Sequence, residues 1–142
     1  MKQHGYGRTS RDRLVTCHPR IISVMEQSIK LCPFDITIVC GARGKAAQDE
    51  YFRNGFSKVE WPNSKHNNEE EGIPMSLAVD AGPWIDAGIP WNDQRAFSVM
   101  AGCVLATANS MDIAMRWGGD WDRDGSTTDQ TFMDLGHFEL VL

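Results

Sequence analysis

The sequence predicts an α+β fold, in which a small antiparallel sheet and flanking helices form one domain over residues 1–142. Helical and strand-like patterns mix along the chain without the regular strand–helix–strand order that a parallel sheet requires. The length is sufficient for a hydrophobic core without disulfide bonds, and no linker separates a second domain.

Three segments show the apolar spacing of a helix, namely 19–31, 45–55 and 94–111. Pro19 opens the first and Pro33 follows its end, which are the two places where proline is favourable around a helix. Gly55 closes the second segment. The third is the longest, and we expect it to be the main core helix.

Strands are predicted where short apolar runs stand between turn residues, at 34–40, 77–81, 112–117 and 137–142. The first alternates apolar and polar residues, as a half-buried strand does. Residues 56–76 show no helical or strand-like periodicity of apolar residues and are rich in Asn, Glu, Ser and Pro, so we expect a long loop there.

The net charge of −5 argues against nucleic acid as a partner, because phosphate binding needs clustered cations. Residues 1–20 are basic, and we expect them to form a solvated terminus rather than a binding arm. No apolar run has the length of a signal peptide or of a membrane span. We therefore expect a monomer that is made in the cytoplasm without membrane insertion.

Four cysteines stand at positions 17, 32, 40 and 103. Their spacing matches no CxxC zinc motif, and several have apolar neighbours. In a chain made in the cytosol we expect reduced, mostly buried thiols, and we assign them no chemistry.

Two of the four histidines lie in polar, turn-rich sequence at the edges of predicted strands, and these are His66 and His137. Asp80 ends an apolar run, where an unpartnered carboxylate is costly to bury. Two imidazoles and a carboxylate form a catalytic zinc set that leaves the fourth position to water. From spacing alone, solvated histidines and an aspartate that caps a turn explain the same residues.

A resemblance decides between these interpretations. The chain resembles the zinc-dependent peptidoglycan peptidases of the D-alanyl-D-alanine carboxypeptidase/dipeptidase family, and most of all the bacteriophage endolysins that cleave the L-alanyl-D-glutamate bond. Three motifs carry the likeness, Ser64-Lys65-His66, Ala78-Val79-Asp80 and Asp134-Leu135-Gly136-His137-Phe138-Glu139-Leu140. Further matches in the expected order extend it over nearly the whole chain, at 13–19, 34–37, 41–43, 48 and 116–119.

The resemblance implies that zinc is held by His66, Asp80 and His137. It implies that Asp134 is the general base, three residues before a ligand and one water away from the metal. Glu139 is the alternative base, although we expect it to orient a ligand instead. Arg43 is expected to stabilise the developing oxyanion or bind a substrate carboxylate, whereas Ser64 either contacts substrate or shapes its turn.

The sequence departs from the family at residues 67–77, which lengthen the segment between His66 and Asp80. Loop closure entropy grows slowly with length, so the two side chains still meet if the extension bulges outward. Because of this departure, the substrate contacts of this segment do not follow from the resemblance.

Two further features of the sequence give weaker indications of function. Asp120, Asp122 and Asp124 resemble the first half of a calcium loop, but Thr131 stands where its bidentate glutamate belongs, so a plain acidic loop is the alternative. Trp84 and Trp91 each follow a proline, and they either line a cleft or cover an edge of the core.

The resemblance implies a zinc endopeptidase that cleaves L-alanyl-D-glutamate in peptidoglycan peptide stems. It would accumulate in the host cytoplasm and reach the wall after the inner membrane is breached. The alternatives are cleavage at the D-alanyl-D-alanine end, or a non-catalytic domain that binds the cell wall and uses zinc only to fold.

Overall fold

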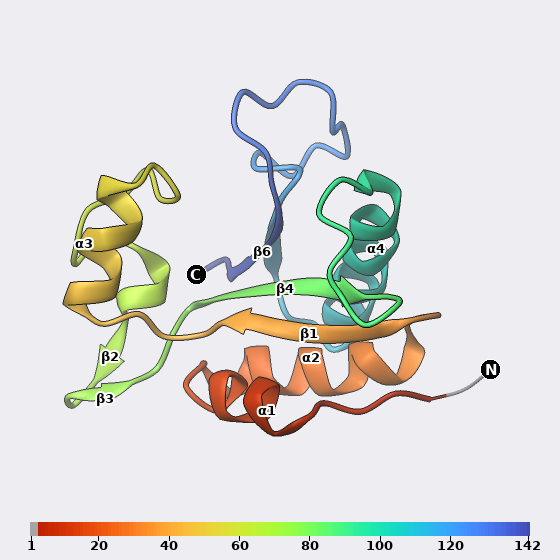
Figure 1. The fold of residues 1–142 in the computed structure, drawn as a ribbon, viewed down its shortest axis with the longest axis horizontal. Helices are drawn as coiled ribbons and strands as arrows, with labels where there is room; N and C mark the ends of the chain where they lie inside the picture. Colours follow the sequence, from red (N-terminus) through yellow and green to blue (C-terminus); the bar gives the residue numbers. More distant parts are fainter. Residues whose placement is uncertain (1–2) are drawn as a thin grey trace.

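The computed structural model describes residues 3–142 and has a four-stranded antiparallel sheet with flanking helices, as predicted (Figure 1). The strand order is β1-β4-β6-β5, and a separate two-stranded hairpin joins β2 and β3. The elements are α1 (Arg8–Leu14), α2 (Pro19–Leu31), β1 (Asp35–Cys40), α3 (Lys45–Arg53), the 3-10 helix η1 (Lys65–Asn67), β2 (Glu69–Glu70), β3 (Ile73–Pro74), β4 (Ala78–Trp84), α4 (Gln94–Ser110), β5 (Met115–Gly118) and β6 (Asp134–Leu140).

One hydrophobic core lies between the sheet and the two longest helices. Helix α4 packs against β4, β5 and β6 and also against α2, while α1 packs against β1. Helix α2 buries the face that its periodicity predicts, including Ile21, Val24 and Met25. Helix α3 lies away from these layers at one end of the sheet (Figure 1). Among the described residues, no helix has the length and apolar character needed to cross a membrane.

The basic N-terminal segment is more ordered than the sequence suggests. Its first two residues lie outside the described part of the chain, but α1 follows and buries Leu14 against the core. The Tyr6 hydroxyl donates to the carbonyl of Met25 at 2.8 Å, and Arg13 donates to the carbonyl of Ile38 at 2.9 Å. The segment is therefore tied to α2 and β1, while its basic side chains Arg8, Arg11 and Arg13 stay exposed to solvent as expected.

The long loop predicted at 56–76 contains two short elements, η1 and the exposed β2–β3 hairpin. Glu71 and Gly72 both have positive φ, as a two-residue hairpin turn of this kind requires. At the base of the hairpin, the Leu77 amide donates to the carbonyl of Lys65 at 2.9 Å. The chain extension therefore leaves and rejoins the fold at neighbouring points, and it bulges outward.

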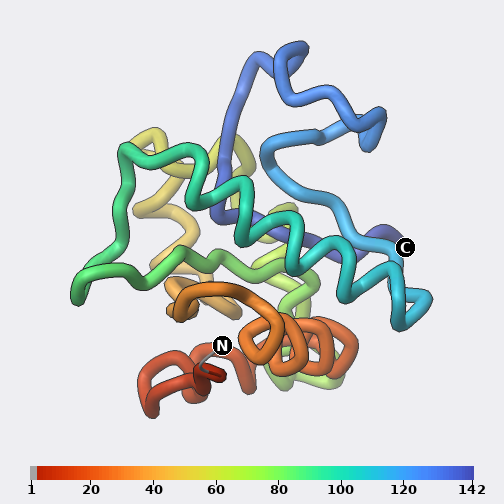
Figure 2. The backbone as a smooth tube through the Cα atoms, turned by 90° about the vertical axis from the view of Figure 1, so that its right-hand side faces the viewer, coloured from red at the N-terminus to blue at the C-terminus, as the bar shows by residue number. Residues whose placement is uncertain are grey.

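The last strand begins earlier than predicted. Strand β6 begins at Asp134 rather than at His137 and ends at Leu140. Strand β4 extends to Trp84, beyond the predicted run. The loop between β5 and β6 projects from the body of the protein (Figures 1 and 2).

Gly118, on β5, permits a close approach of β6. A Cβ at this position would collide with the backbone carbonyl of Asp134, which pairs with it across the strands. We therefore expect Gly118→Ala to push the strands apart and lower the melting temperature. Gly102→Ala is the matched control, because the space there is open and alanine stabilises a helix interior by roughly 0.5–1 kcal/mol. Equal melting temperatures for the two variants would contradict this explanation.

Candidate metal centre

The register of two central strands brings Asp80 and His137 together. Asp80 on β4 lies directly opposite His137 on β6, so the two side chains share one face of the sheet. His137 Nδ1 lies 3.0 Å from Asp80 Oδ1. These two residues are 57 positions apart in the chain, and the antiparallel pairing alone makes them neighbours.

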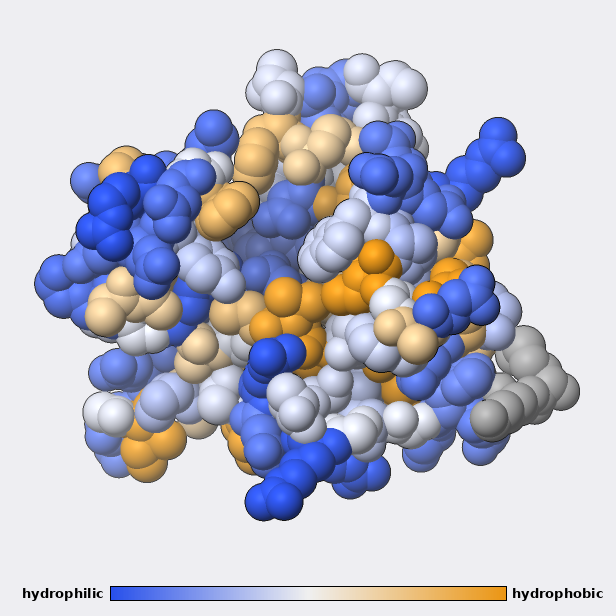
Figure 3. Space-filling model, in the orientation of Figure 1, coloured by the Kyte–Doolittle hydropathy of each residue, from blue (hydrophilic) through white to orange (hydrophobic). Residues whose placement is uncertain are grey.

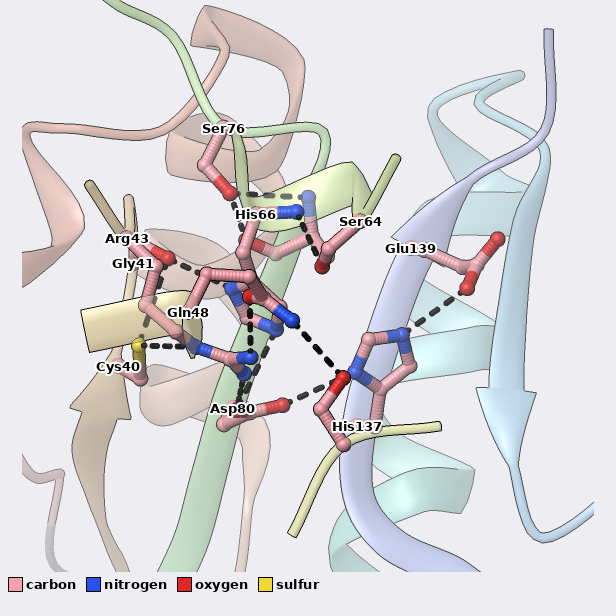
Figure 4. Close-up of polar contacts among 12 residues, drawn as sticks. Cys40, Gly41, Arg43, Gln48, Ser64, His66, Ser76, Asp80, His137 and Glu139 are labelled. Atoms are coloured by element: carbon pink, nitrogen blue, oxygen red, sulfur yellow. Dashed lines mark hydrogen bonds and ion pairs between the residues drawn. The ribbon is translucent and has the colours of Figure 1, made fainter. Parts of the chain in front are cut away.

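His66 approaches the same carboxylate from the other side. It lies in η1, whose first turn is capped by Ser64: the Ser64 hydroxyl accepts from the His66 amide at 3.2 Å. His66 Nδ1 donates to the carbonyl of Gly41 at 2.6 Å, and this bond turns Nε2 toward Asp80 Oδ2, 3.3 Å away. Figure 4 shows both imidazoles directed at Asp80.

Two overlapping sets of side chains bring candidate ligand atoms within 4.8 Å of one another. One contains Cys40, His66 and Asp80, and the other contains Asp80, Asp134 and His137. Asp80 belongs to both. The two predicted histidine ligands therefore flank the predicted aspartate ligand, and the structure adds Cys40 and Asp134 beside them.

The donor types suit zinc, which takes imidazole nitrogens and carboxylate oxygens as ligands. The two histidine nitrogens face different oxygens of Asp80, with His137 Nδ1 3.0 Å from Oδ1 and His66 Nε2 3.3 Å from Oδ2, so the histidines belong to separate sets that share Asp80. His66 Nε2 is also buried without a hydrogen-bond partner among residues 3–142. A buried nitrogen without a partner is costly, and a metal ion would satisfy it.

Arg43 is held rigidly beside the carboxylate. Its Nη2 donates to Asp80 Oδ2 at 3.1 Å, and its Nη1 donates to Gln48 Oε1 at 2.9 Å. Its Nε donates to Cys40 Sγ at 3.4 Å, and the Tyr51 ring lies 4.3 Å from its guanidinium carbon. These contacts fix a buried positive charge at the floor of the site.

Glu139 contacts the opposite edge of the His137 ring. Its Oε1 accepts from His137 Nε2 at 3.0 Å, and its Oε2 lies 3.3 Å from Lys65 Nζ. Because Nε2 is occupied by this bond, Nδ1 is the nitrogen that faces Asp80. The geometry gives Glu139 the contact expected of a residue that orients a ligand.

The charges at the site are strongly coupled. Burial disfavours protonated His66, but the Asp80 carboxylate outweighs it and raises the His66 pKa to about 10. For His137, burial is likewise outweighed by hydrogen bonds to Asp80 and Glu139, and the pKa rises to about 8. The same partners hold the pKa of Asp80 well below its usual range, despite its burial. In the metal-free protein, both shifts favour the protonated imidazoles.

Asp134 lies at the start of β6, where it lines the cavity next to the metal centre. Burial raises the pKa of its carboxyl group, and the neighbouring Asp80 charge raises it further. A carboxyl group with a raised pKa is suited to accept a proton and later return it.

A cleft of about 680 Å³ opens over these residues. Figure 3 shows a hollow near the centre of this face, with a hydrophilic floor and hydrophobic residues on parts of its rim. The 119–133 loop forms one wall, where the Trp121 ring lies 5.4 Å from the His137 ring and the Trp121 indole donates to the carbonyl of Phe132. We call this cavity the central cleft. It gives a substrate access to Asp134, His66 and His137.

The candidate calcium residues lie in the same projecting loop. Asp120, Asp122 and Asp124 bring carboxylate oxygens within 4.8 Å of one another, but their carboxylates also accept hydrogen bonds from loop amides. The amides of Asp124 and Gly125 donate to Asp120, as they would in a plain acidic turn. Calcium binding therefore stays a prediction.

Sequence reasoning missed two residues of the site. Cys40 received no role, yet it contacts Arg43 and lies within ligand distance of His66. Gln48 is fully buried and joins Arg43 to Asn67, the residue after His66, by accepting a hydrogen bond from each. Position 48 is among the matches to the family in the sequence, and this match was the one signal that pointed to it.

Comparisons with known proteins point to one family. The family model described as phage L-alanyl-D-glutamate peptidase matches residues 3–141. The chain is 32% identical over 140 residues to the L-alanyl-D-glutamate peptidase of Escherichia phage T5, with 96% of this chain and 97% of the relative covered. Its fold is similar to the crystal structure of the Serratia marcescens L-Ala D-Glu endopeptidase ChiX, with a TM-score of 0.76, 23% identity, and 96% and 90% of the two chains covered.

The coupled charges predict how the metal-free protein responds to pH. The raised pKa values of His66 and His137 stabilise the fold fully below pH 6.5, and this stabilisation is lost as pH rises through about 8 and about 10. With a chelator present, we expect the melting temperature to fall over this interval. In Asp80→Asn the histidines lose the carboxylate that raises their pKa values, so the fall should be smaller. Identical pH profiles would contradict the coupling.

Proposed function

Because the chain belongs to the phage L-alanyl-D-glutamate peptidase family, we propose that it is a zinc endopeptidase that hydrolyses the L-alanyl-D-glutamate bond of peptidoglycan stem peptides. One observation carries the zinc-dependent part of the proposal. The partly buried carboxylate of Asp80 lies between two imidazoles that line an open cleft, and the carboxyl group of Asp134 lies beside it.

In this proposal His66, Asp80 and His137 hold the zinc ion. When bound, zinc supplies a Lewis acid that lowers the pKa of a water molecule to about 7 and polarises a carbonyl group. The bond from His66 to the Gly41 carbonyl and the bond from His137 to Glu139 orient the two rings before any metal arrives. Such outer contacts keep the ligand nitrogens aimed at the metal position.

Asp134 is the proposed general base. It accepts a proton from the attacking water and returns it to the leaving amine of D-glutamate, so that an amide and water give a carboxylate and an amine. Its raised pKa favours the second transfer. Glu139 is less suited to this role, because His137 and Lys65 already occupy its two oxygens.

Arg43 is the proposed electrostatic partner of the reaction. Its guanidinium group is buried, fixed by four neighbours, and borders the cleft where the scissile carbonyl must lie. A positive charge fixed in advance stabilises an oxyanion without reorganising during the reaction. Ser64 acts through its cap on η1, which sets the position of His66.

The biological setting follows from the family. We propose that the protein acts as a monomeric endolysin, which is made in the host cytoplasm and reaches the wall once the inner membrane is breached. Its partner is then the peptide stem of peptidoglycan.

Asp134→Asn tests whether Asp134 acts in proton transfer and not in zinc binding. We expect it to reduce peptidoglycan hydrolysis by about 10²–10⁴-fold while zinc is retained at one equivalent, since only proton transfer is lost. His137→Ala should lose both zinc and activity. Metal analysis and turbidity assays on purified walls measure the two effects. An Asp134→Asn variant as active as the wild type would remove Asp134 from the mechanism.

The bond that is cleaved is identified by the fragments that are released. We expect mass spectrometry of digested peptidoglycan to show stems that begin with D-glutamate, and glycan strands that retain L-alanine. Free D-alanine without such stems would favour the D-alanyl-D-alanine alternative. Wall binding and zinc uptake without fragments would favour a non-catalytic domain.

A further inference from the structure

The proposed reaction does not specify which half of the substrate lies on which side of the site. The L-alanyl-D-glutamate bond has two unlike halves. L-Alanine is joined through its amino group to a lactyl group on a sugar ring, whereas D-glutamate keeps a free carboxylate when one of its carboxyl groups continues the peptide. The site must hold both halves, so the chemistry of its surroundings determines which half lies where.

A second cavity of about 410 Å³ meets the central cleft. Arg43, Phe56 and Asp134 line both, so the scissile bond lies where the two cavities join. Apart from Arg43, Asp80 and Asp134, the second cavity has no charged lining residue within the described chain. We call it the aromatic cavity, because Tyr51, Phe56, Trp91 and Phe97 contribute to its walls.

Trp91 has the features of a binding platform in this cavity. Its side chain is 65% exposed, yet its ring is stacked on Phe97, with centroids 5.9 Å apart and an interplanar angle of 28°. Phe97 is buried in the core, so the exposed indole rests on a rigid base. A large aromatic face that is exposed to water beside a reaction site offers a flat apolar surface on which a ligand ring can pack.

The central cleft is lined by charged residues of both signs, with Lys58 and Lys65 beside Asp122, Asp129 and Glu139. No lysine lines the aromatic cavity. Lys65 is engaged with Glu139, but Lys58 lies above the Phe132 ring at 5.5 Å and makes no ion pair within the described residues. A cation without an acidic partner at the mouth of a cleft suits a substrate carboxylate.

We infer that the aromatic cavity binds the sugar-bearing L-alanyl half of the substrate, with Trp91 as the platform for the sugar ring, and that the central cleft binds the D-glutamyl half. This inference rests on the proposed function. It makes Trp91 a specificity-determining residue that distinguishes glycan-linked stems from free peptides.

The test compares two substrates that differ only on the alanine nitrogen, N-acetylmuramoyl-L-alanyl-D-glutamyl peptide and acetyl-L-alanyl-D-glutamyl peptide. The wild type should cleave the muramoyl substrate with the higher kcat/KM. Trp91→Ala should lower kcat/KM for that substrate by about tenfold, mostly through KM, with little change for the acetyl substrate. Trp91→Phe should restore part of the preference.

Trp84→Ala is the matched control. Trp84 also follows a proline and is 41% exposed, but it borders a separate depression beside the N-terminal segment. Its replacement should leave both substrates unchanged. Two results would overturn the inference but not the proposed function. One is a wild type with equal kcat/KM for the two substrates. The other is an equal loss of kcat/KM on both substrates in Trp91→Ala at an unchanged melting temperature. A wild type that cleaves neither substrate would overturn the proposed function and the inference with it.

Discussion

The pairing of Asp80 with His137 across β4 and β6 is the interaction on which the site depends. Backbone hydrogen bonds set this register, so the sheet itself places the two side chains opposite each other. A shift of β6 by one residue relative to β4 would turn His137 to the other face of the sheet, away from Asp80. The glycines around β6 permit the close strand approach that maintains the register: a Cβ at Gly136 would collide with the Ala81 carbonyl, as one at Gly118 would with Asp134.

A partly buried carboxylate is tolerated at Asp80 because several partners share its charge. Arg43 and two imidazoles surround Asp80, and the arginine is itself held by Gln48 and Tyr51. A buried charge without partners would be strongly destabilising, so each partner supports the fold of the metal-free protein. The same partners compete with a metal, since both histidines must release protons before they can bind one. Contacts that stabilise the metal-free fold therefore lower the affinity of the site for a metal.

The sequence was informative where its patterns are local or its motifs specific. The apolar periodicity of α2 and the alternation of β1 predicted both elements within one residue. The motifs around His66, Asp80 and His137 predicted residues that the fold brings together, although their roles stay predictions. The start of β6 was missed because Asp134 and Gly136 are unfavourable in strands. The links through Gln48 and Cys40 are long-range contacts, and no local pattern encodes them.

The extension between His66 and Asp80 shows how such a site accepts insertions. The added residues form an exposed hairpin, and the bond from Leu77 to Lys65 closes its base. His66 is anchored separately by Ser64 and by the Gly41 carbonyl, and Asp80 by the sheet. Because no anchor of either side chain lies within the hairpin, its length is decoupled from their geometry. The chain between two candidate ligands can therefore vary while the distance between them does not.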